Sequence, residues 1–195
     1  LNLNKIIRMQ AYSEYPSMSG HKTGIGSRMG TPTRAETLEL LQKQLEKIEK
    51  LIQALISNND LLNQQNKLLL SVPGIGTQTA ANMIASTNAF TSFSNWRKYA
   101  CHCGVAPFEY SSGSSVKGRT KVNHMANKKL KSLLNMAALS AKKYDTEISH
   151  YFERKVKEGK NKMLVLNAIR CKVISRAFAV INRNSPFVNT LKAVG

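Results

Sequence analysis

Apolar residues recur at alternating spacings of three and four between residues 38 and 69. Such a heptad pattern favours a long helix that joins a coiled coil, and polar residues in the seam fix its register and partner at a cost in stability. The alternative is an amphipathic helix that packs on its own domain, or two helices in a hairpin if residues 57–60 interrupt the repeat. The seam positions are Leu38, Leu41, Leu45, Ile48, Ile52, Leu55, Asn59, Leu62, Asn66 and Leu69.

The segments on either side of this repeat set the expected domain boundaries. Residues 1–32 open with a pattern that predicts a short helix, and residues 16–32 are rich in Gly, Ser and Pro, which is typical of a flexible linker. Thr33 and Glu36 form a capping-box pair at a helix start, and Pro73 ends the repeat. We therefore expect a helix and linker over 1–32, a coiled-coil helix over 33–71, and a helical domain over 72–195.

Positive charge is concentrated in the second half of the chain. The 195 residues carry a formal net charge of +18, but residues 1–90 hold only 9 Lys and Arg against 6 Asp and Glu. Residues 91–195 hold 20 against 5. A surface this basic favours a polyanionic partner, chiefly nucleic acid. The alternative is a solvated basic surface kept for solubility or assembly.

The chain shows neither an apolar run long enough for a membrane span nor a signal peptide at its start. Three cysteines are an odd number and predict free thiols rather than a disulfide framework. We therefore expect a cytoplasmic location with no membrane partner.

The run Val-Pro-Gly-Ile-Gly-Thr over 72–77 brackets one apolar residue with two glycines just before a new helix. Glycine lets the backbone approach a ligand closely, and a helix start offers free N–H groups to a phosphate. The run is similar to the turn of helix-hairpin-helix modules, which grip the DNA backbone. It indicates contacts from Gly74, Gly76 and Thr77, although Pro-Gly-x-Gly is also a common plain turn.

Aromatic residues at 90, 93, 96 and 99 recur every three positions and predict core packing. Cys101, His102 and Cys103 follow them and invite a zinc interpretation. Because a structural zinc site needs four ligands, normally in two pairs, and the sequence has no second pair, we expect no metal site in this chain.

A loop rich in serine and basic residues covers 110–124 and leads into a helix with lysines beside its apolar face. Hydroxyl groups flanked by Lys117, Arg119 and Lys121 suit a phosphodiester, since cations stabilise charge on phosphoryl oxygens and a serine can attack phosphorus. A phosphate-binding or linker loop without a covalent role fits the composition equally well.

Two further helices complete the chain. Asp145 or Thr146 can cap the first, Gly159 ends it, and the residues from Ser185 are expected to fray. No regular strand pattern occurs, so the sequence predicts an all-α fold, with a short hairpin around the serine loop left open.

Residues 69–184 resemble the C-terminal domain of the DEDD-type transposases of bridge-RNA-guided bacterial insertion sequences, known as the transposase-20 type. The matching motifs are VPGIGTQTA at 72–80, GVAP at 104–107, Ser112-Gly113, KGRTKV at 117–122 and HMANKKLKSLLNMAALSA at 124–141. The resemblance implies that Ser112 attacks DNA to give a phosphoserine-type intermediate. It implies that residues 72–195 form a serine recombinase-like DNA-binding domain.

In that family an N-terminal RuvC-like domain carries acidic metal ligands and precedes the coiled coil. The six acids of residues 1–70 lie in no strand-like context, so that domain and its Mg²⁺ are expected to be missing here. The implied partners are double-stranded DNA, a guide RNA and a second copy of the chain, at the bacterial nucleoid. DNA contacts are expected from Gly74, Gly76, Thr77, Gly113, Lys117, Arg119, Lys121, Asn127, Lys128 and Lys129.

Three functional hypotheses follow from the sequence. The first is the strand-joining domain of a transposase, inactive alone, with Ser112 as nucleophile. The second is a noncatalytic helix-hairpin-helix module that uses the same glycines and lysines. The third is an oligomerisation adaptor that acts through its coiled coil.

Overall fold

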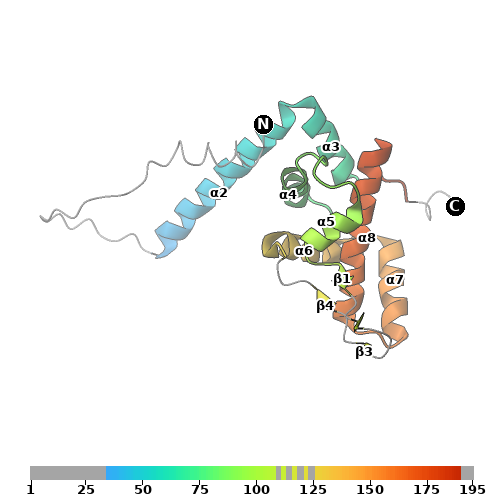
Figure 1. Cartoon of the computed structure of the whole chain (residues 1–195). Helices are drawn as coiled ribbons and strands as arrows, with labels where there is room; N and C mark the ends of the chain where they lie inside the picture. The colour runs from blue at the N-terminus through green and yellow to red at the C-terminus, as the bar shows by residue number, and fades with distance from the viewer. Residues whose placement is uncertain (1–33, 109–110, 113–115, 118–120, 123–125, 190–195) are drawn as a thin grey trace, which may run out of the picture. The chain divides into compact units, whose positions relative to one another are not determined.

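The structure is a computed structural model that describes residues 34–108, 111–112, 116–117, 121–122 and 126–189 (Figure 1). It divides into two compact units, Leu1–Asn59 and Asp60–Gly195. The helix and linker expected over 1–32 lie outside the described residues.

The first unit contributes one described helix, α2 (Arg34–Ser57). Four seam residues of its first turns are about half exposed, with exposed fractions between 47% and 59%. Because apolar side chains on a soluble helix normally bury one face, this seam is open to a further helix. The exposed seam residues are Leu38, Leu41, Leu45 and Ile48.

The long helix expected over 33–71 is interrupted, and a second helix, α3 (Asp60–Leu70), begins after the break. The prediction of one continuous helix is therefore wrong, and the interruption at residues 57–60 is confirmed. Ser, Asn and Asp side chains compete for backbone hydrogen bonds, and an acidic residue favours a helix start. In α3 the seam residues Leu62, Asn66 and Leu69 are buried within the second unit. The two compact units divide between residues 59 and 60, because α3 packs within the second unit.

The second unit is a bundle of helices around α8 (Lys162–Arg183), which packs against α3, α5 (Trp96–His102), α6 (Lys128–Tyr144) and α7 (Thr146–Lys157). Helix α4 (Thr77–Thr87) packs on α3 and α6. Figure 1 shows α8 in red beside α7. Residues three and four apart on α8 form one fully buried stripe, as an amphipathic helix requires. These residues are Val165, Ile169, Val173, Ala177 and Val180.

Four two-residue strands interrupt the helices: β1 (Pro107–Phe108), β2 (Ser111–Ser112), β3 (Val116–Lys117) and β4 (Lys121–Val122). β1 pairs antiparallel with β4, and β2 pairs antiparallel with β3, so the pairs nest in one hairpin. The short hairpin that the sequence allowed around the serine loop is therefore present. With strands this short, the all-α prediction is confirmed.

Side-chain caps explain where the later helices begin. Asn95, Asn127, Asp145 and Asn161 each accept a hydrogen bond from the first turn of the following helix. The cap predicted at Asp145 is confirmed, and Gly159 follows α7 with φ of 82°.

The segment after α8 is better anchored than the sequence suggested. The backbone N–H of Phe187 donates to Ser71 Oγ at 2.8 Å, and the Arg176 guanidinium lies 4.7 Å from the centre of the Phe187 ring. The prediction of fraying from Ser185 is therefore wrong for residues 185–189. None of the helices described is both long and apolar enough to cross a bilayer.

Candidate nucleic-acid interface

The hairpin that carries Ser112 leaves and rejoins the bundle at one junction. The backbone N–H of Asn127 donates to the His102 carbonyl at 3.2 Å, which ties the start of α6 to the end of α5. The Asn127 side-chain oxygen accepts from the Leu130 N–H at 3.2 Å and caps α6. The outer strand pair of the hairpin, β1 and β4, thus lies in the chain between two helix ends joined by a hydrogen bond.

Backbone pairing sets the register of the predicted nucleophile and a predicted lysine. Ser112 lies opposite Val116, and Lys117 lies opposite Ser111, the residue before Ser112. Lys121 lies opposite Phe108 in the outer pair. Gly113 and Arg119 lie outside the described residues.

The first turn of α6 carries exposed cations at its amino end. Lys128 and Lys129 are exposed, and the turn contains no acidic residue. Cations at a helix N-terminus are unfavourable by a few tenths of a kcal/mol, since the helix dipole is positive there. An anion bound at this end would be attracted both by the lysines and by the dipole. Asn127, also expected to contact DNA, caps this helix with its side chain and remains exposed.

The two glycines of the 72–77 turn have different environments. Gly74 has φ of +94°, and a Cβ there would lie 2.4 Å from the Ala137 carbonyl oxygen and 2.7 Å from Ala141 Cβ. Close packing on the alanine face of α6 is therefore enough to require glycine here, while the predicted phosphate contact of Gly74 stays a prediction. Gly76 is exposed, with no atom within 4 Å of its Cβ position, and it begins α4 without a side-chain cap. Thr77, the first residue of α4, is also exposed.

Gly74→Ala should lower the free energy of unfolding by about 3 kcal/mol, from backbone strain at positive φ and from displacement of α6. Gly76→Ala is the matched control and should cost no more than about 1 kcal/mol, because alanine is a weaker N-cap residue than glycine. Urea unfolding followed by circular dichroism measures both. Equal losses would contradict the packing role of Gly74.

The core packing expected for the aromatic residues is confirmed for Tyr99, whereas Phe90, Phe93 and Trp96 are half-buried. Tyr99 is fully buried, its ring centre lies 5.2 Å from that of Phe93, and its hydroxyl lies 2.8 Å from Ser86 Oγ. Burial raises the pKa of the Cys103 thiol to about 12, so this thiol stays protonated at neutral pH. The His102 ring is 5.4 Å from that of Phe93.

Among the residues that the structure describes, no three His, Cys, Asp or Glu side chains gather where they could hold a metal ion. These residues therefore do not fit the Mg²⁺ that the resemblance assigns to a RuvC-like domain. The steps assigned below to this chain involve only its own side chains.

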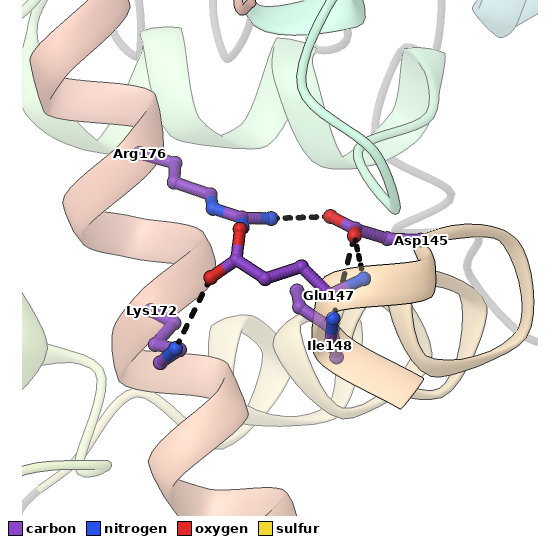
Figure 2. A network of polar contacts seen from close by, with 5 residues as sticks. All are labelled: Asp145, Glu147, Ile148, Lys172 and Arg176. Atoms are coloured by element: carbon purple, nitrogen blue, oxygen red, sulfur yellow. Dashed lines mark hydrogen bonds and ion pairs between the residues drawn. The ribbon is translucent and has the colours of Figure 1, made fainter. Parts of the chain in front are cut away.

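Two basic residues of α8 belong to an internal ion-pair network (Figure 2). Arg176 bonds Asp145 Oδ2 at 2.5 Å and Glu147 Oε2 at 2.6 Å, and Lys172 Nζ lies 3.6 Å from Glu147 Oε1. In the sequence, Lys172 and Arg176 are not distinguished from the other cations of the basic second half. The one signal for their role was a pair of acids, Asp145 and Glu147, in an otherwise basic stretch.

Part of the chain is similar in sequence to a known protein family. Residues 66–153 match the family model described as "Transposase IS116/IS110/IS902 family". This match runs from α3 through the hairpin and α6 into α7. It supports the resemblance found in the sequence at the level of a transposase family domain.

Similar curated proteins are longer than this chain. The "Pilin gene-inverting protein" of Moraxella bovis is 29% identical over 145 residues, which cover 73% of this chain and 45% of the relative. The protein of the same name from Moraxella lacunata has the same identity and coverage. "Insertion element IS110 uncharacterized 43.6 kDa protein" of Streptomyces coelicolor is 27% identical over 162 residues, 83% of this chain and 39% of the relative. The chain spans less than half the length of these relatives.

Proposed function

We propose that this chain is the DNA-binding and strand-joining part of a transposase or related DNA recombinase, with Ser112 as its nucleophile. The match of residues 66–153 to a transposase family carries the proposal, because it includes the 72–77 turn, the hairpin and the start of α6. Relatives named for gene inversion and for an insertion element support the same class of reaction.

The charge distribution supports DNA as the partner. Residues 91–195 hold 20 Lys and Arg against 5 Asp and Glu, and Lys128 and Lys129 are exposed where α6 begins. In the hairpin, Lys117 pairs with Ser111, the residue before Ser112. Cations in these places would hold the phosphates on either side of the reacting phosphodiester and reduce charge repulsion as the serine approaches.

The proposed reaction is a transesterification at phosphorus. Ser112 Oγ forms a bond to the phosphorus, and the bond from phosphorus to one deoxyribose oxygen breaks. The serine proton passes to solvent and the departing sugar oxygen gains a proton, so one phosphodiester is exchanged for another without an outside energy source. Attack by the hydroxyl of another strand reverses these bond changes and joins the DNA.

Complete recombination is proposed to need more than the described residues. The resemblance implies a RuvC-like domain with Mg²⁺ and a guide RNA that selects the DNA site, and the relatives are more than twice as long as the matched segment. In this proposal the basic unit binds the DNA backbone, and sequence selection comes from pairing with the RNA.

Binding to short duplex DNA should be insensitive to sequence and steep in salt. If about a third of the 20 cations in residues 91–195 engage phosphates, the slope of log K against log salt is roughly −6. Fluorescence anisotropy on two unrelated duplexes at several salt concentrations measures it. A flat salt response would rule out the proposed DNA-binding role.

We also propose that α2 pairs with α2 of a second copy through its open seam. Leu45→Asp should weaken self-association about 100-fold, since each of two chains would place a charge in the seam. Leu40→Asp is the matched control, because Leu40 is equally exposed, at 57%, but lies off the seam. Sedimentation velocity distinguishes them. Equal effects from the two variants would exclude the coiled coil.

The noncatalytic helix-hairpin-helix alternative shares the DNA-binding prediction but not the chemistry. In that alternative, Ser112 forms no bond to DNA under any condition. The presence or absence of a covalent adduct between Ser112 and DNA therefore separates the two functions.

A further inference from the structure

Arg170, on α8, is a nearly buried cation of the helical bundle. Only 7% of the surface of Arg170 is exposed to solvent. The two terminal nitrogens of its guanidinium donate to side-chain amide oxygens on α6 and α8. Nη2 donates to Asn135 Oδ1 on α6 at 2.6 Å, and Nη1 donates to Asn167 Oδ1 at 3.3 Å. Both acceptors are neutral, so these bonds orient the guanidinium without neutralising it.

The charge of Arg170 has no counterpart among the described residues. No described carboxylate lies within ion-pair distance of it, and its Nε is buried without a hydrogen-bond partner. Burial lowers the pKa of the guanidinium, which reflects the cost of keeping the charge there. Arg176, six residues later on the same helix, is neutralised in the usual way, because it pairs with the carboxylates of Asp145 and Glu147. An unpaired buried charge lowers stability, so a negative partner from beyond the described residues would stabilise Arg170.

Arg170 lies at the root of the hairpin that carries Ser112. Asn167 Nδ2, on the residue that accepts from Arg170, donates to the Val105 carbonyl at 2.7 Å. Val105 stands two residues before β1. Two hydrogen bonds therefore link the guanidinium, through Asn167, to the backbone two residues before the hairpin begins.

The other neighbour of Arg170 lies on a basic face of α6. Asn135 is seven residues after Lys128 and four after Lys131, and residues at these spacings share one face of a helix. The guanidinium is therefore at the inner end of a row of cations that begins at the exposed start of α6. A row of positive charge with no acid in it suits a polyanion rather than an acidic side chain of the same chain.

We propose that a phosphate of bound DNA is the missing negative partner of Arg170, at the root of the Ser112 hairpin. This inference rests on the proposed function. Two of the five guanidinium N–H groups are bonded to the asparagines, and in this proposal those that remain receive phosphate oxygens. The asparagines hold the plane of the guanidinium fork in advance. Arg170 thus positions the DNA backbone beside the hairpin.

Arg170→Met in the full chain tests the proposal, because methionine has similar length and no charge. We expect the melting temperature without DNA to stay the same or rise, since a buried unpaired charge is removed. Affinity for a 30-base-pair duplex should fall about tenfold, and the salt slope should become less steep by about 1. Arg183→Met is the control: Arg183 is exposed at the far end of α8, about 20 Å away, and should change neither melting temperature nor slope in this way.

Each outcome bears on the proposal. A lower melting temperature with an unchanged salt slope would show that Arg170 is structural and would overturn it. Loss of self-association with unchanged DNA binding would assign the missing partner to a carboxylate of another chain, and would also overturn it. If the wild-type chain binds no duplex at all, the proposed function fails first.

Arg170→Lys keeps the charge and gives a test if the methionine variant does not fold. Lysine cannot form the planar fork, so the proposal predicts several-fold weaker binding at an unchanged salt slope. Wild-type affinity in the folded lysine variant would contradict it.

Discussion

Asp145→Ala should lower the free energy of unfolding by about 4 kcal/mol, the largest loss of stability we expect from one side chain in this chain. The Asp145 side chain is fully buried, and its Oδ1 accepts from the N–H groups of Glu147 and Ile148 at 2.9 and 3.3 Å (Figure 2). Loss of this N-cap costs about 1 kcal/mol. The side chain of Arg176, 14% exposed, would lose its buried partner, which costs about 3 kcal/mol more.

Two further substitutions divide this effect into its parts. Asp145→Asn keeps an N-cap oxygen and removes the charge, so it should cost about 3 kcal/mol. Glu147→Gln changes a carboxylate that is 36% exposed and should cost less than about 1 kcal/mol, because solvent screens that pair. Urea unfolding followed by circular dichroism measures all three. A loss below about 1 kcal/mol for Asp145→Ala would show that the network of Figure 2 does not stabilise the bundle.

Local patterns in the sequence predicted the helices well. Helix α6 follows from the apolar residues between 130 and 141, and the start of α7 follows from the capping ability of Asp145. These features depend on neighbours within one or two turns, which a linear pattern records. The break in the heptad repeat at residues 57–60 was harder to predict, because the spacing of the seam residues is the same whether a helix packs on its own domain or on another chain.

The candidate site was predicted only in part, because long-range packing decides the role of each residue. The glycines at 74 and 76 look alike in sequence, yet only Gly74 packs on α6. The neighbouring residues in the sequence do not predict this contact. Arg170 and Arg176 both lie on one basic helix, yet Arg176 pairs with two carboxylates and Arg170 bonds two side-chain amides. Charge counting finds the basic half, but it cannot separate cations used inside the fold from those left for a partner.

The second prediction with a large effect concerns Ser112. If this serine is the nucleophile, Ser112→Ala should reduce a covalent protein–DNA adduct at least 1,000-fold, since alanine has no oxygen to bond phosphorus. Noncovalent affinity should change by less than about 1 kcal/mol, because a neutral hydroxyl contributes little net binding. Ser111→Ala is the matched control, since Ser111 neighbours Ser112 on β2. Ser114→Ala and Ser115→Ala give further controls from the same loop.

The most direct measurement combines this chain, a RuvC-like domain supplied in trans with Mg²⁺, a guide RNA and a suicide DNA substrate whose cleavage traps the adduct. Denaturing gels and peptide mass spectrometry then identify the residue bonded to DNA. The proposed function predicts an adduct on Ser112 that persists in the Ser111, Ser114 and Ser115 variants and is absent in Ser112→Ala. An adduct that survives Ser112→Ala, or that maps to Tyr110, would contradict it.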